Sequence, residues 1–422
     1  MRGRLKGVDP ALAAIVAEGF FSRLSFGLIS FGLPLYAYQR FGLSLTEVGM
    51  LASLNLAIAV ALKPFMGSLA DRVGLKPSFL VAIGLRSVVS LLLALAAAPW
   101  HLFAIRGAHG FSIALRDPSS NVLLAELGGK KAVASAFAWY QTAKSVAGAV
   151  GKASAGILLT LTASNFSLLF LVAFVLSLLP VVVVARYVRE PAADHERVRE
   201  ELAAAADRID ADEVARPRPA VLRFAGLGFL TSGTAYMLAN LFPIFAVEYA
   251  GLSEAETGLI YTISIAVVLT GPVFGWLSDH VSHKLVLSVR SVANITSSVV
   301  YYLAPNFAGM AVGRAVDDAG KAAFRPAWGS LMAQVASLDR RRRARTMGSL
   351  SAGEDAGEMA GPILAGFLWS TWGVGVLLAV RIVLAAVTEL YTFVLVRTLS
   401  PSAQVPQEPP AEVPRPARPV AR

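Results

Sequence analysis

Charged and titratable side chains interrupt two long apolar stretches of this sequence. The first stretch holds Arg106, His109, Arg116 and Asp117, and spacings close to helical repeats place them along one side of a helix. Inside an apolar stretch, such a side chain either binds a charged ligand or a proton, or it pairs with another side chain and only stabilises the fold. We expect binding here, with internal pairing as the alternative. The second stretch holds the matching set Arg314, Asp317, Asp318, Lys321 and Arg325.

Covalent catalysis and metal chemistry are not indicated. The five histidines form no cluster with a nucleophile or with carboxylates, although an activated nucleophile or a metal site requires one. The chain has no cysteine, which excludes disulfides and thiolate metal ligands. We therefore expect neither an enzyme, nor a cofactor, nor a metal site.

Reversible protonation is the chemistry open to the carboxylates in these stretches. Asp117 is the first candidate, because Arg116 beside it offers the carboxylate a contact when the proton leaves. Asp317 or Asp318 comes next, and Glu18 follows. Arg23 lies five residues from Glu18 in the first apolar run of the chain, and we expect its side chain to face a cavity.

The elements that position these residues are apolar runs of membrane-spanning length. Of 422 residues, 55% are hydrophobic and 16% are charged, whereas soluble proteins carry charge on about 25% of their residues. A helix needs ~20 apolar residues to cross a bilayer. We predict an all-α integral membrane protein with twelve transmembrane helices, at 12–36, 45–66, 79–98, 102–124, 137–161, 168–185, 224–247, 257–277, 285–303, 307–335, 346–368 and 374–395.

The last six runs repeat the first six. Arg106 matches Arg314 at an offset of 208 residues, and Gly42 matches Gly251 at an offset of 209. A recurring offset of this kind marks a duplicated unit. We predict two pseudo-symmetric six-helix bundles at 1–187 and 221–397, a cytoplasmic linker at 188–220 and a disordered, Pro-rich cytoplasmic tail at 398–422.

Basic residues are concentrated in every second connection between the runs. Lys130, Lys131, the segment 186–218 and the segment 340–345 are examples, whereas the connections between them are short and nearly uncharged. By the positive-inside rule, the basic connections and both termini are cytoplasmic. The net charge of +10 thus reflects topology. We expect a multi-pass protein of the cell membrane, in contact with lipid and not with nucleic acid.

A polar segment between the second and third runs is the most specific motif. It reads Gly-Ser-Leu-Ala-Asp-Arg-Val-Gly-Leu-Lys at 67–76, and a looser copy lies at 275–284. In this place and in duplicate, the segment resembles the signature loop of the major facilitator superfamily, and the resemblance extends over 12–395. It implies two bundles around a central cavity, which opens alternately to either side of the membrane, and a monomer as the working unit.

The resemblance also implies a conformational latch at the cytoplasmic side. It places Asp71 at the start of helix eleven, and because Leu75 stands where the family has a basic residue, Lys76 or Arg72 would pair with Glu126. Helix eleven packs on helix two in this fold, so Lys63 with Glu354 or Glu358 is a candidate pair between the bundles. The full set of latch positions is Gly67, Asp71, Arg72, Gly74, Lys76, Glu126, Gly275 and Asp279.

By this resemblance we expect a secondary active transporter of a small organic solute, driven by protons. The sequence contains no P-loop motif that would indicate ATP as the driving force. Cations outnumber acids on the cavity helices, which favours an anionic or zwitterionic substrate. The alternatives are a proton-driven multidrug exporter of lipophilic cations and, in another class, a receptor-like or lipid-handling membrane protein. The cations are Arg23, Arg106, Arg116, Arg314, Lys321 and Arg325, against Asp117, Asp317 and Asp318.

Overall fold

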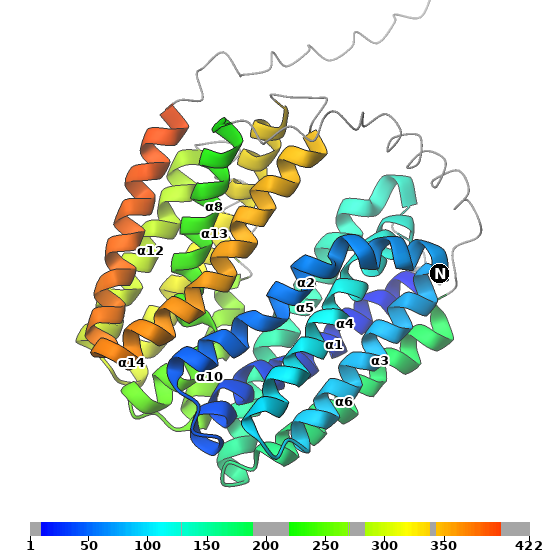
Figure 1. Ribbon diagram of the computed structural model, residues 1–422, viewed down its shortest axis with the longest axis horizontal. Coiled ribbons are helices and arrows are strands. Elements are labelled where there is room, and N and C mark those ends of the chain that lie inside the picture. The colour runs from blue at the N-terminus through cyan, green and yellow to red at the C-terminus, as the bar shows by residue number, and fades with distance from the viewer. Residues whose placement is uncertain are drawn as a thin grey trace, which may run out of the picture.

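In its described residues the protein folds into two helical bundles, which Figure 1 shows in blue to green and in green to red. The computed structural model describes residues 10–127, 129–188, 219–268, 270, 283–337 and 343–397. The first bundle contains α1 (Pro10–Leu35) with the π-helical turn η1 (Tyr36–Arg40), α2 (Leu45–Val73), α3 (Leu75–Ala94), α4 (Pro99–Leu127), α5 (Gly129–Leu161) and α6 (Phe166–Tyr187). The predicted all-α fold is confirmed over these residues.

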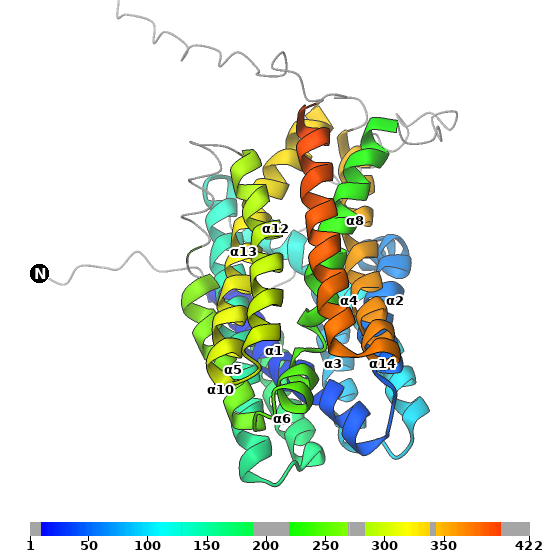
Figure 2. The ribbon, with the colours of Figure 1, turned by 90° about the vertical axis from the view of Figure 1, so that its left-hand side faces the viewer.

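The second bundle repeats this order. It contains α8 (Pro219–Ala239), continued by α9 (Phe242–Ile244) and the π-helical turn η3 (Phe245–Tyr249), then α10 (Glu254–Val268), α12 (His283–Leu303), α13 (Phe307–Ser337) and α14 (Arg343–Arg397). Gly373 has a non-helical conformation inside α14, with φ 84° and ψ 175°. It divides α14 into two helices, and Figure 2 shows the second of them running beside α8 and α12.

Several helices are apolar enough to cross a membrane. Five described helices meet this criterion by length and composition, and a sixth does so when the bent pair Val221–Ala239 and Phe242–Tyr249 counts as one span. The other long helices, α4, α5, α12 and α13, carry the charges described below. Most of the predicted linker (189–218) and the whole predicted tail (398–422) lie outside the described residues.

Equivalent turns follow the first helix of each bundle and bear out the internal repeat. Each begins with a π-helical turn and reaches a glycine with positive φ, which is 64° at Gly42 and 68° at Gly251. Two residues later, Ser44 accepts a hydrogen bond from the backbone of Glu47, whose carboxylate accepts one from the backbone nitrogen of Ser44 at 2.8 Å. Ser253 and Glu256 form the same capping box in the second bundle.

Closely packed glycines join the two bundles. Gly156 of α5 lies against α10, where a Cβ atom at position 156 would be 2.1 Å from the carbonyl oxygen of Glu254. Gly49 of α2 lies against α14, where a Cβ atom would be 2.3 Å from the carbonyl oxygen of Pro362. Two helices approach this closely only where side chains are absent. The α5–α10 and α2–α14 contacts are equivalent under the internal repeat.

In the described residues, several hydrogen bonds join the two bundles at the end of the molecule that holds the turn after α1. Gln39 Nε2 donates to Glu248 Oε1 at 3.0 Å, and the Oγ atoms of Thr46 and Ser370 are 3.1 Å apart. Ser164 Oγ donates to Glu254 Oε1 at 2.6 Å. The bundles are therefore closed against each other at the end that holds the turns after α1, α5 and η3.

Replacing Gly156 by leucine should oppose this closure, because the new side chain would displace the α10 backbone. Overpacking costs about 1–3 kcal/mol, which would lower the ratio of closed to open molecules about fivefold or more. Closure is measured by disulfide formation in a Thr46→Cys, Ser370→Cys variant of this cysteine-free chain. Gly84→Leu is the control, since a Cβ atom there has no neighbour within 4 Å. Equal cross-linking in both variants would contradict the prediction.

Candidate functional site

A cavity of about 310 Å³ lies between the two bundles. Both bundles contribute to its wall through α1, α5, α10 and α13. Its charged lining consists of five cations and one carboxylate, and hydroxyl and aromatic groups complete the wall. The charged residues are Arg23, Lys144, Lys152, Arg314, Arg325 and Asp318.

The cations of this cavity are mostly left without a carboxylate. Arg314 Nε donates to Asp318 Oδ2 at 2.9 Å. Lys152 instead lies over the ring of Tyr261 at 4.5 Å, and Arg23 lies over the ring of Phe26 at 5.0 Å. Within the described part of the chain, Arg23, Lys152 and Arg325 take part in no ion pair. The lining of the cavity therefore carries an excess of positively charged side chains.

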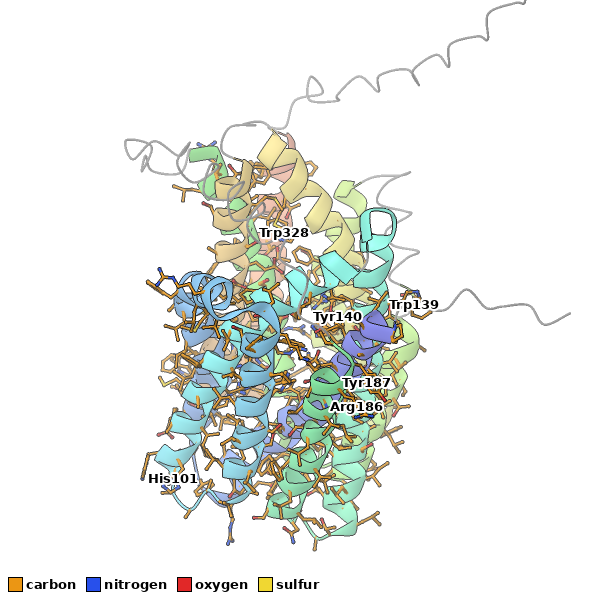
Figure 3. The ribbon with its side chains drawn as sticks, turned by 90° about the vertical axis from the view of Figure 1, so that its right-hand side faces the viewer. His101, Trp139, Tyr140, Arg186, Tyr187 and Trp328 are labelled. Atoms are coloured by element: carbon orange, nitrogen blue, oxygen red, sulfur yellow. The ribbon has the colours of Figure 1, made fainter. Side chains whose placement is uncertain are left out.

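The predicted site residue Arg116 points into the first bundle. Arg116 Nη2 donates to both carboxylate oxygens of Glu18, at 2.8 and 2.9 Å, and to Tyr140 Oη at 2.8 Å. Glu18 and Arg116 are 0% and 5% exposed. Figure 3 shows Tyr140 inside the bundle, whereas its neighbour Trp139 lies at the outer edge. In this structure Glu18 and Arg116 pair with each other and tie α1 to α4, and a binding role for them stays a prediction.

Arg106 and His109 also serve the first bundle. Arg106 donates to the backbone carbonyls of Leu51 and Ala52 in α2, both at 3.0 Å, and to the side chain of Asn55. His109 Nδ1 is 3.2 Å from Arg106 Nη1, and its ring is 2% exposed. Arg106 reaches only a smaller cavity of about 100 Å³. The predicted helical stripe of α4 thus faces α1 and α2 and does not line the central cavity.

In the second bundle, Asp317 is the centre of a buried ionic cluster. Its carboxylate lies 2.7 Å from Arg381 Nη2, 2.7 Å from Lys321 Nζ and 3.3 Å from Arg290 Nη1. Arg381 is 0% exposed and also donates to Asn294 Oδ1 at 2.9 Å and to Thr234 O at 3.3 Å. This cluster ties α8, α12, α13 and α14 together. For Asp317, the alternative of internal pairing is therefore what the structure shows.

Two predicted pairings differ from those in the structure. Lys63 pairs with Asp117 at 3.6 Å, and not with Glu354 or Glu358. Asp117 is only 3.9 Å from Arg116 at the closest approach, because Arg116 is directed at Glu18. Asp117 is 38% exposed, so its contacts are those of a solvated ion pair. The predicted proton exchange between Asp117 and Arg116 has no close contact to support it.

The predicted latch is only partly described. The side chains of Gly67, Asp71 and Glu126, and all of Gly275 and Asp279, lie outside the described residues. Gly74 has φ 107°, which permits the turn between α2 and α3. Lys76 Nζ donates to the carbonyl oxygen of Ala185 at the end of α6, at 3.1 Å, and Arg72 is exposed.

Sequence analysis did not select several residues that line the cavity or hold the buried ionic cluster. Lys144 and Lys152 of α5 line the central cavity, and Arg290 and Arg381 hold Asp317. A cation within an apolar run needs a partner or water. Applied to every run, this criterion would have selected all four residues. It would not have identified their partners, which come from other helices.

A family model for the Major Facilitator Superfamily matches residues 18–249 and 224–422. Solved structures with the same fold include a POT family transporter in complex with 5-aminolevulinic acid, at 14% identity and TM-score 0.72, covering 96% of this chain and 98% of that chain. The nucleoside transporter NupG is 14% identical, with TM-score 0.71, covering 92% and 99%.

A third structure, from work on substrate recognition in proton dependent oligopeptide transporters, is 15% identical with TM-score 0.70, covering 93% of this chain and 98% of that chain. No curated protein sequence is significantly similar to this chain. Identities this low establish the shared fold alone. The family match spans both bundles, and the chain therefore belongs to the Major Facilitator Superfamily.

Proposed function

We propose that this protein is a secondary active transporter of a small organic anion or zwitterion, driven by a proton gradient and working by alternating access. The observation that carries the proposal is the excess of unpaired cations in the cavity between the bundles. An unpaired charge near the middle of a membrane costs at least ~2.5–3.5 kcal/mol on insertion scales. A negatively charged ligand would offset that cost when it binds.

The size and lining of the cavity support a small, polar substrate. Its volume of about 310 Å³ is at the lower limit of ligand pockets, which run from ~300 to ~1,000 Å³. Cations from both bundles border it, Arg23 and Lys152 from the first and Arg314 and Arg325 from the second. An anion held between them would draw the bundles together. It would therefore bind the conformation with a closed cavity more tightly than one with the bundles apart, and alternating access requires such a difference in affinity.

The structural neighbours agree with this substrate class. One of them binds 5-aminolevulinic acid, a molecule that carries both a carboxyl and an amino group. Another belongs to work on proton dependent oligopeptide transporters, which supports protons as the coupling ion. At identities near 15% these are analogies of fold, so the substrate assignment depends on the charges of this cavity.

We further propose the orientation that the basic connections indicate, with both termini in the cytoplasm of a cell and the protein in its plasma membrane. The closed end of the two bundles would then be external. In this conformation the central cavity would be reached from the cytoplasm. The monomer is the proposed working unit, because one chain supplies both bundles and the whole cavity.

Lys152→Met should weaken binding of an organic anion about 10- to 100-fold. A hydrogen bond to a charged group contributes ~1.5–3 kcal/mol, and each 1.4 kcal/mol is about tenfold in affinity. The anion is first identified by thermal stabilisation of the purified protein against carboxylates, amino acids, nucleoside phosphates and lipophilic cations. Arg223→Met, which removes an exposed cation of α8, is the control. Hits confined to lipophilic cations would favour the multidrug-exporter alternative.

Asp317→Asn should destabilise the protein far more than Asp117→Asn. The first change leaves Arg381 buried beside a neutral partner, and breaking a buried ion pair costs ~3–5 kcal/mol. The second change breaks a half-exposed pair with Lys63, which contributes ~0–1 kcal/mol. Thermal unfolding in detergent compares the two variants directly. Similar melting temperatures would show that the Asp317 cluster is not a structural requirement.

A further inference from the structure

A second, smaller cavity adjoins the central one. Three residues, Arg23, Ser30 and Lys152, line both cavities. The smaller cavity has a volume of about 100 Å³ and lies among α1, α2, α4, α5 and the turn after α8. Protein interiors leave few voids larger than a water molecule. The fold therefore leaves room beside the central cavity for a further part of a ligand.

The lining of the smaller cavity is mostly apolar. Residues of α1 and α2 supply six apolar side chains, which are those of Phe26, Leu33, Pro34, Val48, Leu51 and Ala52. None of these six described residues lines the central cavity. Apart from the three shared residues, the polar lining consists of Arg106 and Asn240. The central cavity thus offers charged groups, and the smaller one offers an apolar wall.

Arg106 adds no available charge to the smaller cavity, because its guanidinium is occupied by neighbouring helices. Its Nε and Nη2 atoms donate to the carbonyl oxygens of Leu51 and Ala52, both at 3.0 Å. Nη2 also donates to the side chain of Asn55, and Nη1 is 3.2 Å from His109 Nδ1. A ligand group that enters this cavity therefore meets chiefly apolar side chains.

Arg23 and Lys152 lie at the border between the two cavities. The guanidinium carbon of Arg23 is 5.0 Å from the ring centroid of Phe26, which lines only the smaller cavity. Lys152 Nζ is 4.5 Å from the ring centroid of Tyr261, which lines only the central cavity. A carboxylate bound between the two cations would therefore have the apolar wall beside it, within reach of the chain that the carboxylate carries.

Neither cavity offers a carboxylate to an ammonium group of a ligand. Of the described residues that line either cavity, only Asp318 carries a carboxylate. Its oxygens already lie 2.9 Å from Arg314 Nε and 3.3 Å from Lys321 Nζ. Burying an ammonium group without a partner is costly. The lining therefore favours an anion over a zwitterion.

We propose that the substrate is an aliphatic monocarboxylate without an ammonium group, whose carboxylate binds between Arg23 and Lys152 and whose chain fills the smaller cavity. This inference rests on the proposed function and narrows its substrate class. An apolar cavity of about 150 Å³ accommodates benzene, so in proportion a cavity of about 100 Å³ accommodates ~4 carbons. Among straight-chain carboxylates, pentanoate carries four carbons beyond the carboxylate.

The test measures dissociation constants by thermal-shift titration of the purified protein with acetate, propanoate, butanoate, pentanoate and hexanoate at pH 7.5. Burial of one methylene should strengthen binding about three- to fourfold. The dissociation constant should thus fall about 30- to 60-fold from acetate to pentanoate, and no further for hexanoate. 2-Aminopentanoate should bind at least about tenfold more weakly than pentanoate. Affinity independent of chain length, or equal binding of 2-aminopentanoate, would overturn the inference.

Ala52→Leu tests the smaller cavity directly. The larger side chain would occupy the space assigned to the aliphatic chain, so affinity should no longer rise from acetate to pentanoate. Ala61→Leu is the matched control, because Ala61 is exposed on the same helix, and it should keep the wild-type series. A wild-type series in Ala52→Leu would contradict the proposal.

A second variant covers the possibility that Ala52→Leu does not fold. Leu33→Ala enlarges the smaller cavity, so hexanoate should then bind more tightly than pentanoate, and an unchanged limit of chain length would overturn the inference. If another anion binds but no carboxylate does, the inference fails and the proposed function stands. If no anion binds at all, the proposed function itself fails.

Discussion

Pairing of buried charge is the constraint on which the rest of this structure depends. In each bundle a guanidinium and a carboxylate, each at most 5% exposed, hold helices together. Glu18 and Arg116 join α1 to α4, and Asp317 and Arg381 join α13 to the second helix of α14. Because leaving either partner alone in a low dielectric is costly, each pair fixes the rotation of its helices. Each bundle is thereby held together from within.

The cavity between the bundles departs from this rule. Arg23, Lys152 and Arg325 line it without a carboxylate partner in the described residues, and two of the three lie on helices that also carry paired charges. Their positive charge is compatible with the fold because the cavity is open to water or to a ligand. The groups that the fold leaves unpaired therefore border the cavity, and the paired groups hold the helices that carry them in position.

The internal repeat is preserved in architecture but not in chemistry. The turns at Gly42 and Gly251 have the same conformation and the same cap. Arg106 and Arg314 also occupy equivalent positions, yet Arg106 binds the backbone of α2 while Arg314 pairs with Asp318 and lines the cavity. The two halves therefore share a backbone plan but contribute different groups to the cavity.

The sequence by itself determined the helical runs, the repeat and the family resemblance, because hydropathy, periodicity and motif spacing are local properties of the chain. It also indicated that the charged residues of the apolar runs 12–36, 102–124 and 307–335 could bind a ligand or a proton. Only the tertiary structure decided which of them pair. Glu18 and Arg116 are 98 residues apart, and Asp317 and Arg381 are 64 apart.

Such pairings depend on how each helix is rotated about its axis and on which neighbours it meets, and packing of the whole bundle sets both. For that reason Arg116 and Asp317 proved to be internal partners, and Lys152, on a helix that sequence analysis did not place at the cavity, proved to line it.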